Sequence, residues 1–247
     1  MHTYHMARLA VVAIFLLLFQ TSCSFVTLQT IKKQRIVDKI YNSTVLLATS
    51  FKIDNDEDDS EIKAASASGV IVRVDYDKNI SYALTVKHFC EAPVEYDIEL
   101  SDAKYVAYSQ LSLKDDDYKT YDAFVFYVDK TYDLCVVAIT GIGKLVPIAI
   151  SKQDVQLGEH VTTIGAPNLI YPVKFDGYVV TEYGGKACTD CIIVGVTSSE
   201  GSSGSAVYND DYELVGIIIG VNRANDNISI MASLSSINIA LKQSLLL

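Results

Sequence analysis

From Thr44 onward the chain is a succession of short β-rich runs separated by polar or glycine-containing breaks. The thirteen runs are 44–51, 68–74, 81–86, 104–113, 121–128, 134–140, 145–150, 160–165, 177–183, 191–196, 205–208, 213–221 and 228–232. Short strands at such close spacing are typical of an all-β barrel or sandwich. The break at 141–143 is the best candidate for a boundary between two β units. The tail, 235–245, is predicted to be one closing helix with Ile237 and Leu241 on a common face.

Composition excludes several classes of protein. The chain has 247 residues and is 50% hydrophobic and 20% charged, which allows one large or two small domains with a real core. Acidic residues outnumber basic ones 30 to 20, for a net charge of -10. Such a chain lacks the basic surface that phosphate backbones require, so nucleic acid is not an expected partner.

The amino terminus has the pattern of an export signal. Arg8 precedes the uninterrupted apolar run 9–19, and the small-residue exit 20–23 reads Gln-Thr-Ser-Cys. This ending resembles the bacterial lipobox, in which the cysteine, here Cys23, is lipidated and becomes the first residue, although Gln20 stands where that motif prefers leucine. A lipoprotein signal over 1–22, an ordinary cleaved signal and an uncleaved anchor are the three interpretations. Each places the folded part outside the cytoplasm, and the first and last predict membrane anchoring through the N-terminus.

Residues 23–43 separate this signal from the β-rich region. Within them, 27–42 mixes apolar residues with lysines and an arginine, a pattern that fits either a short basic helix or a spacer. The spacer is the favoured interpretation, so the folded domain is predicted to be 44–247.

A glycine- and serine-rich turn is the first segment that could carry chemistry. Residues 201–206 read Gly-Ser-Ser-Gly-Ser-Ala between two β-runs. A tight turn of this kind can expose the hydroxyl of Ser203 while the N–H groups of Gly201 and Ser203 converge on one spot, as in an oxyanion hole. The string alone fits an ordinary loop equally well.

The serine hydroxyl would need a base with a pKa near 7, for which histidine is the natural candidate. The four histidines stand at positions 2, 5, 88 and 160, so only His88 and His160 remain after removal of a signal. His88 ends a predicted strand. His160 lies in an alternating strand, where a surface or lightly buried histidine with no catalytic role is the better interpretation.

A carboxylate at a buried strand edge could accept a hydrogen bond from the Nδ1–H of that histidine and so fix its tautomer. Asp133 stands immediately before a fully apolar strand. Asp122 precedes a similar strand and is the rival candidate.

Together, in the order His88, Asp133, Ser203, these segments resemble the trypsin-like, chymotrypsin-fold serine peptidases, and within them the bacterial HtrA-type branch without a PDZ domain. Four motifs carry the resemblance over about 44–240: S-G-V-I-V at 68–72, L-T-x-x-H at 84–88, D-x-x-x-D-L-x-V at 129–136, and L-G-x-x-V-x-x-I-G-x-P at 157–167. The third motif assigns the triad position to Asp133 rather than to Asp122. The nucleophile turn departs from the pattern, since many relatives have G-N-S-G-G-P where this chain has G-S-S-G-S-A.

The resemblance implies two packed, antiparallel six-stranded β-barrels of the chymotrypsin type, about 44–140 and 155–232, with a C-terminal helix. It implies a serine endopeptidase acting on polypeptide substrates, with catalytic His88, Asp133 and Ser203, an oxyanion hole at Gly201 and Ser203, and no cofactor. The substrate pocket would be formed by Thr197 and by Ile219, Gly220 and Val221. None of these residues is charged, so neutral side chains of small or medium size are the expected preference before the cut.

The cysteines and an acidic loop are two places where a metal site could be suspected. Cys188 and Cys191 lack further cysteine or histidine ligands for zinc, so a local disulfide or two free thiols is expected. Cys90 and Cys135 each lie two residues after a candidate catalytic residue, which brings both towards the site, either bonded or as thiols. The acidic run 54–61 lacks the glycine and the glutamate that a calcium loop needs, which favours a solvated hairpin loop. No metal site is therefore expected.

The sequence thus predicts an exported or membrane-tethered serine endopeptidase of the cell envelope. The alternative hypothesis is a catalytically silent pseudoprotease that uses the same cleft to bind a peptide strand.

Overall fold

The structure of the protein is a computed structural model that describes residues 36, 38–54, 60–110, 118–141, 143, 145–182, 188, 190–222 and 225–246. The expected signal, 1–22, and the candidate lipidation residue Cys23 lie outside the described residues. Of the expected spacer, residues 36 and 38–43 are described, and they are helical. None of the described helices is long and apolar enough to cross a membrane. By its contacts the chain divides after Lys39, and the fold below belongs to the unit Ile40–Leu247.

The first barrel is closed by six antiparallel strands in the order β1-β2-β3-β6-β5-β4. These strands are β1 (Thr44–Asp54), β2 (Ser60–Asp75), β3 (Ile80–Thr85), β4 (Lys104–Gln110), β5 (Tyr118–Val128) and β6 (Cys135–Thr140). Between β3 and β4 lie the short helix α2 (Lys87–Cys90) and the 3-10 turn η1 (Ala92–Tyr96). Strand β6 is apolar except for its last residue, Thr140, and every other residue of this strand is buried.

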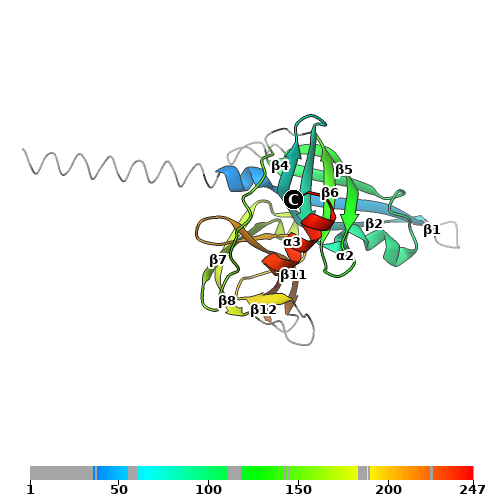
Figure 1. Cartoon of the computed structure of the whole chain (residues 1–247). Helices are drawn as coiled ribbons and strands as arrows, with labels where there is room; N and C mark the ends of the chain where they lie inside the picture. Colours follow the sequence, from blue (N-terminus) through cyan, green and yellow to red (C-terminus); the bar gives the residue numbers. More distant parts are fainter. Residues whose placement is uncertain are drawn as a thin grey trace, which may run out of the picture. The chain divides into compact units, whose positions relative to one another are not determined.

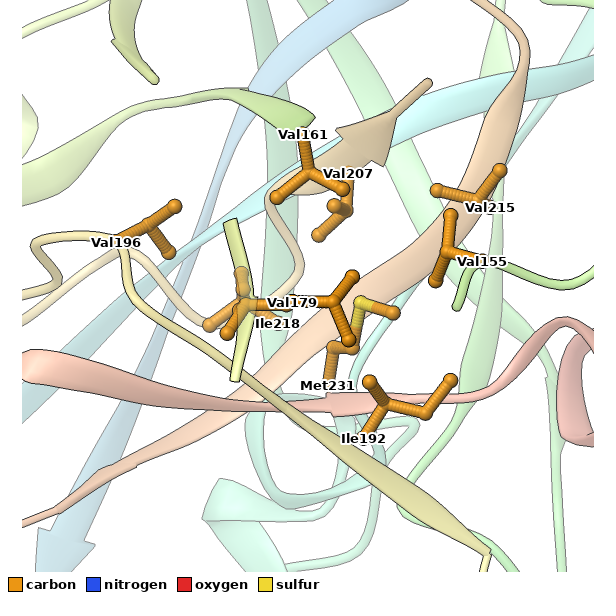
Figure 2. Close-up of a cluster of buried hydrophobic side chains, with 10 residues drawn as sticks. Val155, Val161, Val179, Ile192, Val196, Val207, Val215, Ile218 and Met231 are labelled. Atoms are coloured by element: carbon orange, nitrogen blue, oxygen red, sulfur yellow. The ribbon is translucent and has the colours of Figure 1, made fainter. Parts of the chain in front are cut away.

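The second barrel is closed in the order β10-β11-β12-β9-β8-β7. Its strands are β7 (His160–Gly165), β8 (Val173–Thr181), β9 (Cys191–Val194), β10 (Ala206–Tyr208), β11 (Leu214–Asn222) and β12 (Asn225–Ala232), with the 3-10 turn η2 (Pro167–Leu169) after β7. Figure 2 shows its core, a cluster of valine, isoleucine and methionine side chains pointing at one another from several strands. Branched side chains of this kind suit the interior of a small barrel because they are stiff and fill a pleated surface well.

A single helix, α3 (Leu234–Gln243), follows the second barrel and is the red helix in Figure 1. Ser233 caps it, since its Oγ accepts a hydrogen bond from the N–H of Ser236 at 3.2 Å. Ile237 and Leu241 are both buried, as the spacing on one helix face predicts. The predicted architecture of two six-stranded barrels with a C-terminal helix is therefore confirmed.

One predicted run does not form a strand of either barrel. Residues 145–150 are an extended connection between the two barrels, and their only β-pairing with the described residues is an isolated bridge between Ile150 and Leu214. The segment still hydrogen-bonds, for example from the N–H of Ile148 to the carbonyl of Ile71 at 2.9 Å. Pro147 has no N–H to donate to a ladder, which suits a linker better than a central strand.

Candidate active site

The pairing of β3 with β6 decides which residues meet at the end of the first barrel. These strands are antiparallel, and their last pair joins Thr85 to Cys135. Residues just after β3 therefore lie beside residues just before β6. This register brings His88, in α2, next to Asp133, in the turn that leads into β6.

His88 and Asp133 are joined by two hydrogen bonds. Nδ1 of His88 lies 2.6 Å from Oδ2 of Asp133, and the backbone N–H of His88 donates to Oδ1 at 3.0 Å. The second bond fixes the carboxylate relative to the start of α2, so the plane of the carboxylate and the position of the ring are set together. Both side chains are partly open to solvent, with 47% of His88 and 32% of Asp133 exposed.

The turn that carries Asp133 is built around a different aspartate. Asp129 is buried, and its Oδ1 accepts hydrogen bonds from the N–H groups of Thr131 and Tyr132, each at 2.7 Å. Its own N–H donates to the carbonyl of Leu134 at 3.0 Å. This is the local structure that an aspartate-initiated turn adopts. The first aspartate of the 129–136 motif is thus structural, and it holds the second in place.

A disulfide between Cys90 and Cys135 lies directly behind the histidine and aspartate. Both cysteines are fully buried, and each stands two residues after His88 or Asp133. The carbonyl of Cys90 also accepts a hydrogen bond at 2.6 Å from the phenol of Tyr105 on β4. Burial raises the pKa of that phenol to about 12. The cysteine spacing indicated proximity, and the structure shows a bonded pair.

Ser203 lies in the turn between β9 and β10. Gly201 and Gly204 on either side of it have φ angles of +82° and +86°, a region that side chains with a Cβ rarely adopt. A Cβ on Gly204 would lie 1.9 Å from the carbonyl oxygen of Ser68 and 2.5 Å from Oγ1 of Thr85. Glycine at 204 is therefore required both by the turn conformation and by the close approach of the first barrel.

The backbone amides of this turn fall into two groups. The N–H groups of Ser202, Gly204 and Ser205 donate to the carbonyls of Ser199, Ile218 and Ser202, respectively. Within the described part of the chain, the N–H groups of Gly201 and Ser203 donate no hydrogen bond. Buried unpaired N–H groups are uncommon and need an explanation, and Gly201 is buried.

The barrels meet at the turn, because the carbonyl of Ser203 accepts a hydrogen bond at 2.8 Å from the N–H of Ser68 on β2. The side-chain contacts are different. Among the described residues, the hydroxyl of Ser203 and Nε2 of His88 have no hydrogen-bond partner, so no bond joins the predicted nucleophile to the predicted base.

The predicted pocket residues do not all line one cavity. A cavity of about 450 Å³ is lined by Ile219 and Gly220 of β11 together with Tyr132, Asp133 and Asp190. Thr197 is exposed, and its Oγ1 donates to Oδ1 of Asn227 at 2.9 Å. Neither Thr197 nor Val221 is among the residues that line this cavity.

The rival candidates lie elsewhere. Asp122 is exposed on β5, and its backbone carbonyl accepts a hydrogen bond from Thr140. His160 is bonded through Nδ1 to Oδ1 of Asp210 at 2.7 Å, and its Nε2 lies 3.7 Å from Asp176. In the described part of the chain, no group of histidine, cysteine, aspartate or glutamate side chains is placed to hold a metal ion.

Sequence reasoning missed the polar residues that support the turn. Ser68, Thr85 and Ser205 are all buried, and each makes a hydrogen bond at the junction of the barrels. The available signal was weak, because a serine next to Gly69 in an apolar strand fits an ordinary surface position as well as a buried junction. Cys188 and Cys191 form a second, local disulfide, one of the two states expected for them.

Comparisons with known proteins agree with this architecture. The family profile described as "trypsin-like peptidase domain" matches residues 67–217, which is more than half of the chain. Serine protease HTRA1 of Xenopus tropicalis is 30% identical over 165 residues, which are 64% of this chain and 32% of that protein, and HTRA1 of Xenopus laevis matches with the same figures. The chain thus spans about a third of the length of the curated relatives that it matches.

Two solved structures share the fold. A serine endoprotease from Yersinia pestis superposes with a TM-score of 0.62 at 20% identity, covering 85% of this chain and 65% of that one. Rv3671c of Mycobacterium tuberculosis, in an inactive form with a serine-to-alanine mutation, superposes with a TM-score of 0.59 at 11% identity, covering 84% and 89%. The barrels and the extent of the family match lead to one conclusion: this chain belongs to the trypsin-like peptidase domain family.

Proposed function

We propose that the protein is a serine endopeptidase that hydrolyses peptide bonds, with Ser203 as nucleophile, His88 as general base and acid, and Asp133 as the residue that orients His88. The observation that carries this proposal is the double hydrogen bond between His88 and Asp133, at 2.6 and 3.0 Å. With Nδ1 of the ring bonded to a carboxylate, the proton stays on Nδ1 and Nε2 is left free to accept another. The nucleophile is assigned from membership of the family and from the serine at position 203.

The proposed reaction has two halves. Ser203 Oγ bonds to the scissile carbonyl carbon while Nε2 of His88 takes the hydroxyl proton, and the tetrahedral intermediate then breaks its C–N bond as His88 returns that proton to the leaving amine. Water then attacks the acyl-enzyme, with the same proton exchange through His88, and releases the acid. Asp133 stabilises the imidazolium that forms in each half.

The two unpaired N–H groups support an oxyanion hole at Gly201 and Ser203. The carbonyl of Glu200 accepts a hydrogen bond from the N–H of Asn168 at 2.7 Å. Since N–H and C=O point in opposite directions in a trans peptide, the N–H of Gly201 is directed away from Asn168. Donors held in this way favour the negative oxygen of the intermediate without rearranging at the moment of reaction.

The experiment that tests the proposal is active-site labelling of the purified protein with a fluorophosphonate probe. We expect covalent labelling of the wild-type chain and none of Ser203→Ala, because only an activated serine reacts with the probe. Equal labelling of the two proteins, or none of either, would contradict the assignment.

The same experiment separates the main proposal from a second candidate, a pseudoprotease that binds a peptide strand. The observation favouring that candidate is the absence of a hydrogen bond between Ser203 and His88 among the described residues. Catalytic hydrogen bonds are often long before substrate binds, which is why the enzyme remains the better-supported function. A chain that binds peptides but resists the probe would be the pseudoprotease.

The substrate preference is proposed from the uncharged residues Thr197, Ile219, Gly220 and Val221. A charged side chain before the cut would lose hydration there without gaining an opposite charge. We therefore expect cleavage after neutral residues of small or medium size when a mixed peptide library is digested. Dominant cutting after arginine, lysine or glutamate would show that these four residues do not form the pocket.

Export is proposed from the N-terminal pattern and from the disulfides Cys90–Cys135 and Cys188–Cys191. Disulfides persist in oxidising compartments such as the bacterial periplasm and are rare in the cytosol. If Cys23 carries a lipid, Cys23→Ala will release the protein from the membrane fraction and change its electrophoretic mobility. Unchanged partitioning and mobility would exclude the lipoprotein form and leave a cleaved signal or an uncleaved anchor.

A further inference from the structure

Ser68 lies where the two barrels meet, and it is completely buried. Its hydroxyl donates to the carbonyl of Gly201 at 2.9 Å and accepts from the N–H of Ala166 at 2.8 Å and from the hydroxyl of Ser205 at 3.1 Å. A serine hydroxyl has one proton to donate and two lone pairs, so these three bonds use its full capacity. A fully satisfied buried hydroxyl is a rigid one.

The backbone of Ser68 is used as fully as its side chain. Its N–H donates to the carbonyl of Ser203 at 2.8 Å, and its carbonyl accepts from Oγ1 of Thr85 at 2.7 Å. Ser68 therefore contacts the nucleophile turn on both sides of Ser202, and it also contacts the end of β3, three residues before His88.

We propose that Ser68 is a positioning residue of the active site and that Ser205 assists it: together they fix the nucleophile turn so that the N–H groups of Gly201 and Ser203 stay available to an oxyanion. The inference deepens the proposed serine endopeptidase and rests on it. Neither residue touches the reacting atoms.

The hydrogen bonds of Ser68 fix the orientation of the peptide planes in the turn. Ser68 fixes the carbonyls of Gly201 and Ser203, and hence the two peptide planes that follow these residues. The plane between them carries the N–H of Ser203, and it is held by a bond from the N–H of Ser205 to the carbonyl of Ser202 at 2.9 Å. Because each residue has only two soft dihedral angles, fixing neighbouring planes leaves Ser203 little freedom to turn its N–H away.

Ser205 is one of three positions at which this chain departs from the G-N-S-G-G-P turn of many relatives, the others being 202 and 206. Its hydroxyl occupies space that the neighbouring strand leaves empty, since a Cβ on Gly165 of β7 would lie 1.8 Å from Oγ of Ser205 and 2.6 Å from Oγ of Ser68. The glycine at 165 and the serine at 205 are therefore complementary. The extra hydroxyl gives Ser68 a donor that glycine at 205 could not supply.

The test compares three single variants in the full chain. Ser68→Ala removes three hydrogen bonds and Ser205→Ala removes one, whereas Ser81→Ala is the matched control. Ser81 is also fully buried, on β3, but its hydroxyl has no hydrogen-bond partner among the described residues. Its removal leaves no donor or acceptor unpaired.

We expect Ser68→Ala to lower kcat about 100-fold, comparable to the loss of one oxyanion donor, with KM within about twofold of wild type. Ser205→Ala should lower kcat about tenfold, and Ser81→Ala should leave both constants unchanged. Affinity for a peptidyl boronic acid, which forms a tetrahedral adduct with the serine, should fall in parallel with kcat, while affinity for the cleaved peptide should not. A merely structural role would lower thermal stability without this split between kcat and KM.

Amide hydrogen exchange over 199–206 gives a readout that does not need activity. Exchange should be faster in Ser68→Ala and Ser205→Ala than in Ser81→Ala.

The outcomes distinguish this inference from the proposed enzyme. If the wild-type protein does not react with the fluorophosphonate, the proposed endopeptidase is wrong, and the positioning role of Ser68 and Ser205 is then tested by hydrogen exchange alone. If Ser68→Ala does not fold, Ser205→Ala decides the question. Kinetics and exchange in Ser205→Ala equal to those in Ser81→Ala would overturn the inference.

Discussion

The two halves of the candidate site are held in place by different chemistry. The half in the first barrel consists of an ionisable pair, His88 and Asp133, which is partly exposed and is supported from behind by the Cys90–Cys135 disulfide. The half that carries Ser203 is supported by neutral groups, namely glycines with positive φ and the buried hydroxyls of Ser68 and Ser205. A group that gains and loses charge benefits from water, whereas fixed N–H donors work best where water is excluded.

This difference predicts that the two halves fail in different ways. Solvent competes with hydrogen bonds between exposed groups, so the His88 half depends on a covalent bond that solvent cannot weaken. The Ser203 half depends on the close packing of neutral groups, so it should not tolerate the addition of a single carbon atom.

The largest effect should come from the three proposed catalytic residues. We expect Ser203→Ala, His88→Ala and Asp133→Asn each to lower kcat/KM for a peptide substrate by about 10⁴-fold or more. Asp122→Asn is the control, and it should change kcat/KM less than twofold, because its side chain is exposed on β5. Comparable losses in Asp122→Asn and Asp133→Asn would mean that the wrong aspartate has been assigned.

Adding one carbon atom to the Ser203 half should cause a large loss of stability. Gly204→Ala combines a strained φ of +86° with a Cβ 1.9 Å from the carbonyl oxygen of Ser68, and we expect a loss of about 5 kcal/mol in the free energy of unfolding. Gly158 has a similar φ of +83° but no atom within 4 Å of an added Cβ. Gly158→Ala should therefore cost only about 1 kcal/mol. Urea unfolding of both variants measures the difference, and equal losses would show that packing at the turn is not tight.

Breaking the covalent support of the His88 half should come next. The cysteines 90 and 135 are separated by 45 residues, and 188 and 191 by three. From loop entropy, the double alanine variant of the first pair should lose about 4 kcal/mol and that of the second about 1.6 kcal/mol. In chains that remain folded, the first variant should lower kcat more than the second. Cysteines 90 and 135 each lie two residues after His88 or Asp133, whereas cysteines 188 and 191 only line the cavity beside Asp133. A first-pair variant with wild-type kcat would show that the hydrogen bonds hold the pair without the disulfide.

The smallest effect concerns the phenol that caps the end of α2. Tyr105→Phe removes its bond to the carbonyl of Cys90, which should cost about 1 kcal/mol. Burial raises the pKa of this phenol from 10 to about 12, so the folded protein keeps a proton that the unfolded chain loses above pH 10. The stability gained from the raised pKa is thus present below pH 10 and declines between about pH 10 and 12. Thermal unfolding across that range should show a shallower decline for Tyr105→Phe, and identical slopes would contradict a buried phenol.

Strands were predictable because an alternating or continuous apolar pattern is a local property, visible over five to ten residues. The run 145–150 shows that a local apolar pattern is not sufficient to predict a strand. Its residues have the composition of a strand, yet they connect the two barrels, because strand formation requires a neighbouring edge and both barrels are already closed.

The candidate site residues also divide into those that a local sequence pattern predicts and those that it does not. His88, Asp133 and Ser203 could be named because their motifs are short and ordered along the chain. Ser68 and Ser205 could not, because their importance arises from a contact across 137 positions of sequence. The aspartate at 129 had a place in a motif, but only the turn showed that it supports Asp133 rather than acting itself.

The sequence by itself determined the fold class, the order of the three predicted catalytic residues and the need for small residues around Ser203, since all of these depend on patterns within single segments. The tertiary structure alone decided that Thr85 pairs with Cys135, that Cys90 is bonded to Cys135, and that the hydroxyl of Ser68 lies between the two barrels. The physical reason is that strand register and inter-barrel contacts are set by the free energy of packing the whole chain, in which no single segment carries enough information to fix its distant partner.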